Sequence, residues 1–135
     1  MKARAEGRDR RASGGPVVAV ARDGYALSVM PMVAENLIAE AGRRLAEAAP
    51  DARVILFGSH ARGEAGPDSD LDLLVIEPEF ESRRAEFVRL REELRGLKVA
   101  IDLVLVSDQH VEEWGHFEGT MLNDALNEGR VLAGA

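Results

Sequence analysis

The sequence has no cysteine among its 135 residues, which excludes disulfide bonds and metal sites built from thiolates. It also has no apolar run of membrane-spanning length, for which a helix needs about 20 residues. The basic N-terminus is followed by an apolar run over 17–21, which is too short for the hydrophobic region of a secretion signal. These absences predict a cytoplasmic protein that makes no membrane contact.

Positive charge is scarce outside the N-terminus. The formal net charge is −7, and the first 15 residues carry five Lys or Arg against two acids, which leaves −10 for the other 120 residues. We therefore expect no extended nucleic-acid surface, because such surfaces neutralise phosphates with Lys and Arg. A single nucleotide can still bind, since metal ions can supply the positive charge.

The length fits one compact domain. Residues 30–135 carry the strong periodic patterns and are predicted to form it. Residues 1–29 are predicted to be an N-terminal extension, with a mobile arm over 1–16. The rest of the extension is either a short hairpin around Asp23-Gly24 or a segment without a structural role.

Periodic apolar patterns divide the domain into alternating helices and strands. The predicted helices are 31–48, 81–95, 108–114 and 120–127, and the predicted strands are 53–57, 71–76 and 99–106. An apolar tail, Val131-Leu132, follows the last helix. This order predicts an α/β fold with a small mixed β-sheet flanked by helices.

The connections predict how the strands pair. A compact loop joins the first two strands, which favours an antiparallel pair. A long helix joins the second and third, which favours a right-handed parallel crossover. The third strand is apolar on both faces apart from Asp102 and is predicted to be central. In this arrangement Asp102 lies level with Asp70 and Asp72, close to Gly58-Ser59.

The carboxylates Asp70 and Asp72 open the second strand and point to the same face, because side chains alternate along a strand. Two adjacent carboxylates repel each other, and a cation between them would relieve the repulsion. With Asp102 they provide the oxygen ligands that Mg²⁺ prefers. Two such ions can clamp an in-line displacement at phosphorus. We predict a two-Mg²⁺ site; the alternative is that the acids are simply solvated.

The connection between the first two strands has the residues of a phosphate cradle. Gly58 allows the backbone to approach a phosphate, and Ser59 can cap the short helical turn that follows and can donate hydrogen bonds. Arg62 adds a cation that contacts either a phosphate or an acid. His60 is interpreted as a tolerated loop residue; the alternative is that it lines the site.

Two further expectations concern burial. An acid in an apolar strand should be buried and need a partner, and the alternative to a metal for Asp102 is an ion pair with Arg62 or Lys98. Four large apolar residues near the C-terminus are predicted to be core, with a patch for a partner as the alternative: Trp114, Phe117, Met121 and Leu122.

Gly-Ser-His-Ala-Arg-Gly at 58–63, followed by Ser69-Asp70-Leu71-Asp72-Leu73, resembles the signature of the DNA polymerase β-like nucleotidyltransferase superfamily. It is similar in particular to the minimal nucleotidyltransferases (MNT proteins) of bacterial and archaeal toxin–antitoxin modules. The resemblance covers about residues 31–132 and leaves the N-terminal 29 residues outside it.

The resemblance implies a Mg²⁺-dependent enzyme that transfers AMP from ATP and releases pyrophosphate. Asp70 and Asp72 would hold the metals, and Asp102 would ligate the catalytic metal and help to deprotonate the acceptor. Gly58 and Ser59, with Arg62 and Ser69 of the same motif, would bind the nucleotide.

The implied partner is a HEPN-domain ribonuclease, which the MNT antitoxin would AMPylate and neutralise in a hetero-oligomer. Two alternatives remain open. The chain could be a non-catalytic antitoxin that covers its partner, or a small-molecule adenylyltransferase that works as a dimer.

Overall fold

The computed structural model describes residues 24–66 and 68–134. The chain divides into two units, residues 1–38 and 39–135. Helix α1 (Gly24–Ala48) crosses that division, and the boundary predicted at residue 30 falls inside it. The predicted arm over 1–16 and the first part of the predicted hairpin lie outside the described residues.

Helix α1 begins seven residues before the predicted start at Pro31. The hairpin prediction is therefore wrong for residues 24–30, which are helical. Ala26, Leu27 and Met30 are good helix formers, and their propensity exceeds the turn signal of Asp23-Gly24. The predicted end of this helix, at Ala48, is confirmed.

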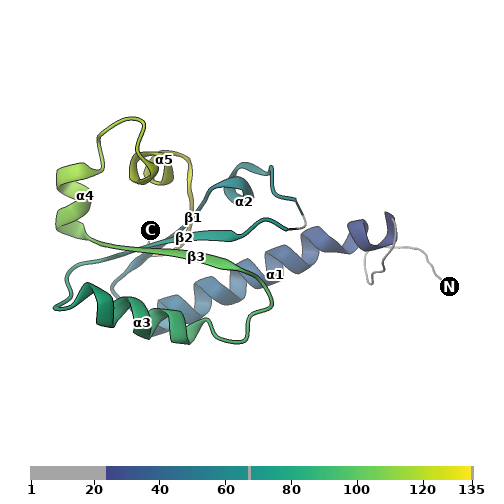
Figure 1. The fold of residues 1–135 in the computed structure, drawn as a ribbon, viewed down its shortest axis with the longest axis horizontal. Helices are drawn as coiled ribbons and strands as arrows, with labels where there is room; N and C mark the ends of the chain where they lie inside the picture. The colour runs from purple at the N-terminus through teal and green to yellow at the C-terminus, as the bar shows by residue number, and fades with distance from the viewer. Residues whose placement is uncertain (1–23, 67, 135) are drawn as a thin grey trace. The chain divides into compact units, whose positions relative to one another are not determined.

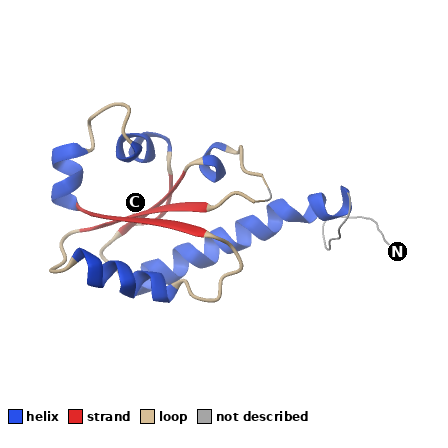
Figure 2. Cartoon of the chain, in the orientation of Figure 1, coloured by secondary structure: helices blue, strands red, loops and turns tan. Residues whose placement is uncertain are grey.

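The second unit holds the sheet and the remaining helices (Figures 1 and 2). In chain order its elements are β1 (Arg53–Phe57), α2 (Ser59–Arg62), β2 (Leu71–Glu77), α3 (Arg83–Glu93), β3 (Ile101–Ser107), α4 (Asp108–Trp114), α5 (Met121–Glu128) and β4 (Arg130–Ala133). The predicted strands and helices of this unit are present, with ends that shift by up to two residues.

The four strands form one mixed sheet in the order β3-β2-β1-β4. β1 and β2 are antiparallel, and β2 and β3 are parallel, as predicted. The fold class predicted from the sequence is therefore confirmed. The central position predicted for β3 is wrong, because β3 lies at an edge. Its apolar faces are explained by α3 and α4, which both contact it.

Strand β4 was not predicted as a strand. Its four residues pair antiparallel with β1, with Val131 opposite Ile55. Four residues are too few to establish an alternating pattern in the sequence. The pairing completes the sheet on the side away from β3.

Side chains of β2 alternate between two packed faces. Leu74 and Ile76 pack with Ile55 of β1 and with Leu122 and Ala125 of α5. Asp72 has the same parity as Leu74 and Ile76, so it lies on the face that α5 covers. Leu71, Leu73 and Val75 face the other way and are fully buried.

The core prediction for the C-terminal apolar residues is confirmed only for Leu122, which is buried. Trp114, Phe117 and Met121 are exposed. Val111 of α4 and Leu126 of α5 already pack against the core cluster, so the helices are anchored without the three larger side chains.

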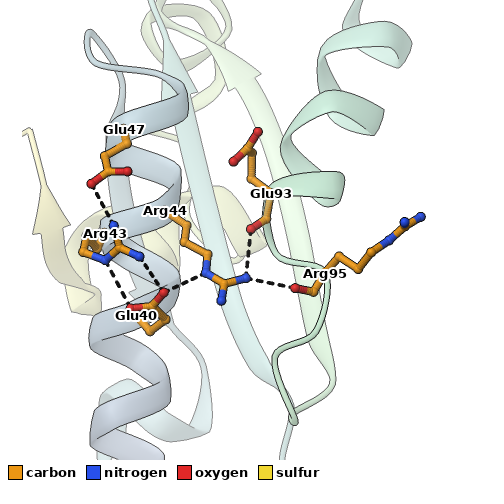
Figure 3. A network of polar contacts seen from close by, with 6 residues as sticks. All are labelled: Glu40, Arg43, Arg44, Glu47, Glu93 and Arg95. Carbon is orange, nitrogen blue, oxygen red and sulfur yellow. Dashed lines mark hydrogen bonds and ion pairs between the residues drawn. The ribbon is translucent and has the colours of Figure 1, made fainter.

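The Arg44 side chain joins α1 to the end of α3 (Figure 3). Arg44 Nη1 donates to the carbonyls of Glu93 (3.2 Å) and Arg95 (2.9 Å), which lie at the α3 C-terminus. Arg43 and Arg44 also donate to Glu40, and these contacts lower the pKa of Glu40 to about 2. No helix in the described part of the chain is long and apolar enough to cross a membrane.

Candidate functional site

Gly58 connects β1 to α2 and packs directly against Asp72. Its φ of 77° lies in the left-handed region, which L-residues adopt at a cost. A Cβ at this position would overlap Asp72 Oδ2 and lie 3.0 Å from Asp72 Cγ. Phe57, the residue before it, is the cross-strand partner of Asp72. Two independent constraints therefore require glycine beside this carboxylate.

Ser59 begins α2, and the predicted side-chain cap is not formed. Gly58 occupies the N-cap position of the four-residue helix and has no side chain to donate or accept. Backbone bonds close the turn instead, from Arg62 N to Gly58 O at 3.1 Å and from Glu64 N to Ser59 O at 2.9 Å. The Ser59 hydroxyl is not used as a helix cap.

The three predicted carboxylates lie at one end of the β2–β3 pair. Asp72 and Asp102 are register partners on these strands, and Asp70 immediately precedes β2. Burial raises the pKa of Asp72, and the charges of Asp102 and Asp70 raise it further, while His60 and Arg62 oppose the shift. All four residues therefore act electrostatically on the Asp72 carboxylate.

Asp102 is exposed, so the prediction that it is buried is wrong. It is the second residue of an edge strand, where one side of the backbone has no neighbouring strand. An exposed carboxylate does not need the ion-pair partner that a buried one requires. Its side chain is accessible to a ligand or solvent.

The candidate site could bind a divalent cation only through the carboxylate oxygens of Asp72 and its neighbours. Within residues 24–66 and 68–134, no group of three or more His, Cys, Asp or Glu side chains is arranged to hold a metal ion. Mg²⁺ does not need such a cage, because it usually binds one or two carboxylates together with waters and substrate phosphates. The aligned pair Asp72 and Asp102, with Asp70 within electrostatic reach, suits that mode.

Arg62 is paired with an acid. Its Nε donates to Glu64 Oε1 at 2.9 Å, both side chains are exposed, and the contact raises the pKa of Arg62. An exposed ion pair contributes little to stability, because water screens its charges. Arg62 can therefore exchange Glu64 for a phosphate at little cost.

His60 connects the two halves of the motif, which the sequence interpretation missed. Its Nε2 lies 3.4 Å from the carbonyl of Ser69, so the tautomer protonated at Nε2 can donate to that oxygen. The Ser69 hydroxyl accepts from Gly66 N at 2.9 Å. These contacts hold the loop before Asp70 against α2. The only sequence signal was the place of His60 next to the Gly-Ser turn.

Comparison with known proteins identifies one family. The profile of the nucleotidyltransferase domain family matches residues 38–132. No curated protein matches the sequence.

Solved structures that are similar to this chain include toxin–antitoxin complexes. A mutant of the toxin–antitoxin MntA-HpeT matches with a TM-score of 0.50 and 20% identity, covering 75% of this chain and 73% of that one. A toxin–antitoxin with AMP-PNP matches with a TM-score of 0.49 and 21% identity, covering 75% and 73%. The Shewanella oneidensis complex of a tri-AMPylated HEPN toxin with MNT antitoxin matches with a TM-score of 0.47 and 17% identity, covering 78% and 73%.

Proposed function

The chain belongs to the nucleotidyltransferase domain family and is a nucleotidyltransferase, and on that basis we propose that it transfers AMP from ATP to a protein. The proposed acceptor is a HEPN ribonuclease toxin, which the chain would neutralise as its antitoxin. The observation that carries the proposal is the register pairing of Asp72 with Asp102 beside the Gly58 turn.

The proposed reaction is an in-line displacement at the α-phosphorus of ATP. The acceptor oxygen forms the new bond to phosphorus, the bond to the bridging oxygen breaks, and pyrophosphate leaves. Mg²⁺ held there would supply positive charge that offsets the triphosphate and would lower the pKa of the acceptor hydroxyl. Asp70, Asp72 and Asp102 would hold the ions, and Asp102, which is exposed, would also take the acceptor proton.

Residues of the connection between β1 and β2 would bind the triphosphate. Gly58 has no side chain to stand between the backbone of the turn and a phosphate, and Ser59 has a hydroxyl that no helix cap uses. Arg62 would leave Glu64 to contact a phosphate. Ser69 would contribute by holding the loop in place through Gly66.

The toxin partner is proposed from the motif at 58–73 and its resemblance to MNT proteins. The fold likeness to a toxin–antitoxin structure at a TM-score of 0.50 is in keeping with it. A protein acceptor also fits an exposed site, because Asp102 at the sheet edge is open to a macromolecule.

A label-transfer assay tests the proposal. The protein is incubated with α-labelled ATP, Mg²⁺ and the product of the neighbouring gene, alongside Asp70→Asn/Asp72→Asn and a matched control, Asp68→Asn. Asp68 is an exposed acid in the same loop, and it lies between the two motif segments, 58–63 and 69–73. We expect label on the partner with the wild type and the control, and none with the double variant.

Ribonuclease activity of the partner, measured in the same reactions, separates the alternatives. If the double variant neutralises the partner fully without label, neutralisation occurs by binding and the catalytic proposal is wrong. Label found only on a small molecule would instead identify a small-molecule adenylyltransferase.

A further inference from the structure

Exposed rings gather at the turn between α4 and α5. Trp114 is 53% exposed, Phe117 46% and Met121 47%. The Trp114 and Phe117 rings lie 5.4 Å apart, and His116 stacks on Phe117 at 4.5 Å. We call the three exposed rings, Trp114, His116 and Phe117, together with the exposed side chain of Met121, the aromatic patch.

The turn that carries the patch is well defined. Asn123 Nδ2 donates to Gly115 O at 2.9 Å, and Thr120 Oγ1 donates to Phe117 O at 2.8 Å. Gly115 is buried, and a Cβ there would lie 2.6 Å from Val111 O. The rings are thus presented on a fixed backbone, although the core does not use them. Solvent-exposed rings on fixed backbone are typical of binding anchors.

The surroundings of the patch are acidic. Residues 108–128 contain six Asp or Glu and no Lys or Arg. Exposed acids flank the rings on both sides, namely Glu112, Glu113, Glu118 and Asp124. This charge repels nucleic acids and anionic lipids. It favours a surface with Arg or Lys, whose side chains also pack on aromatic faces.

A second copy of the chain is a poor occupant. Two-fold association sets a patch against the same patch on the partner, so acids would face acids. The negative charge of the whole chain adds to that repulsion. A basic protein of another kind avoids both costs.

We propose that the aromatic patch docks a protein partner that presents Arg or Lys next to an apolar side chain. This inference rests on the proposed function in one respect, that the docked partner is the acceptor protein. α4 and α5 lie on one side of the sheet (Figure 1), and Val104 and Val106 of β3 pack on that side, so Asp102 shares it by parity. Ser107, the N-cap of α4, is five positions after Asp102, which is about 17 Å along the strand. A docked partner can therefore reach the carboxylates without covering them.

The single tryptophan of the chain reports on this surface directly. Trp114 is exposed in the free protein, so its emission should lie at long wavelength and acrylamide should quench it. We titrate the full chain with the product of the neighbouring gene, using a tryptophan-free version of that protein. Docking should shift the emission to shorter wavelength and reduce the quenching.

Affinity measurements on variants complete the test. Phe117→Ala and Trp114→Ala should each weaken binding about tenfold or more, as expected for aromatic anchors. Val88→Ala is the matched control, since Val88 on α3 is also 53% exposed, and its affinity should equal that of the wild type. Glu112→Lys should also weaken binding relative to the wild type, because it places a positive charge beside the aromatic patch. Glu79→Lys makes the same change of charge outside residues 108–128 and should have little effect on the affinity.

The outcomes separate this inference from the proposed function. Label transfer with unchanged affinity in both aromatic variants overturns the docking surface and leaves the transferase intact. Docking through the patch without label transfer overturns the proposed reaction alone. Concentration-dependent self-association that Trp114→Ala abolishes, or no binding at micromolar concentrations, overturns the docking proposal.

Discussion

At the scale of single residues, Gly58 and Gly63 flank α2 with nearly the same backbone conformation but different surroundings. Their φ angles are 77° and 75°. A Cβ at Gly58 would overlap the Asp72 carboxylate, whereas a Cβ at Gly63 would meet nothing within 4 Å. Substitution of Gly63 therefore tests backbone strain alone, whereas substitution of Gly58 tests backbone strain together with contact with the candidate site.

We predict that Gly63→Ala lowers the free energy of unfolding by about 1 kcal/mol, the cost of a left-handed alanine. Gly58→Ala should lose more, because Asp72 must move, and it should also lose label transfer. Urea unfolding and the transfer assay measure the two effects. Equal stability losses, with activity retained in both variants, would contradict the contact with Asp72.

Glu77, at the far end of β2 from Asp72, forms an unusual acid pair with Glu86. Burial first, then a hydrogen bond and the charge of Glu86, raise the pKa of Glu77 to about 7. The hydrogen bond with Arg89 and the one with Glu77 lower the pKa of Glu86 to about 2. Glu77 is thus the member of the pair that holds a proton more readily, while Arg89 neutralises the ionised Glu86.

This pair predicts opposite pH dependences for its members. Because the pKa of Glu77 is raised from 4.5, its stabilising contribution is full below about 4.5 and is lost as the pH rises to about 7. The contribution of Glu86 is present above 4.5 and is lost as the pH falls towards 2. Glu77→Gln should therefore flatten the decline in stability between pH 4.5 and 7.

Urea unfolding at a series of pH values measures that decline. Glu79→Gln is the control, because Glu79 is an exposed acid two residues further along the chain. It should keep the wild-type profile. A Glu77→Gln profile parallel to that of the wild type would show that the raised pKa of Glu77 does not contribute to the pH dependence of stability.

At the scale of elements, the sequence predicted what a repeating pattern can specify. β1 was predicted at its observed bounds, and the helix predicted over 108–114 is α4 at its observed bounds. β4 was missed because its four residues do not establish an alternating pattern. The position of β3 at the sheet edge was also not predictable, because an apolar pattern reports coverage of the faces and not of the edges.

The short connection from α5 to β4 gives a prediction at this scale. Gly129 has an ordinary φ of −74°, but a Cβ there would overlap Ile55 Cγ2 and Ala125 O. We predict that Gly129→Ala destabilises the protein by about 1–3 kcal/mol through overpacking, without backbone strain.

Gly66→Ala is the control for this change, because a Cβ at Gly66 meets nothing within 4 Å. Its effect should stay within about 0.5 kcal/mol. Thermal unfolding measures both variants. If Gly129→Ala were as stable as Gly66→Ala, the close packing of Gly129 against Ile55 and Ala125 would be wrong.

At the scale of the whole molecule, the sequence predicted which chemical groups would share one end of the sheet. The strand pairings brought Asp72 level with Asp102 as predicted. Side-chain environment was less predictable, because it depends on neighbours distant in sequence. Asp102 is exposed at an edge, Arg62 pairs with Glu64, and Trp114 lies outside the core. The exposure of Asp102 and of Trp114 depends on which helices and strands pack over them, and that is a property of the tertiary structure.

Negative charge also sets the ligand dependence of stability. The chain has a net charge of −7, and the charges of Asp102 and Asp70 help to raise the pKa of Asp72 above 3.8. A raised pKa means that the ionised carboxylate costs stability, and the cost grows as the pH rises through that pKa. At pH 7 we therefore predict that Asp72→Asn is at least as stable as the wild type when no ligand is present.

Mg²⁺ with ATP should reverse that order. A ligand at ten times its Kd stabilises the native state by about 1.4 kcal/mol, which raises the Tm of a domain of this size by about 5 °C. The wild type and Asp68→Asn should show the increase, and Asp72→Asn should not. NaCl at matched ionic strength should not reproduce it, since screening acts on all surface charges and binding acts at one site. An equal rise in Tm for Asp72→Asn would mean that the nucleotide and metal bind elsewhere on the molecule.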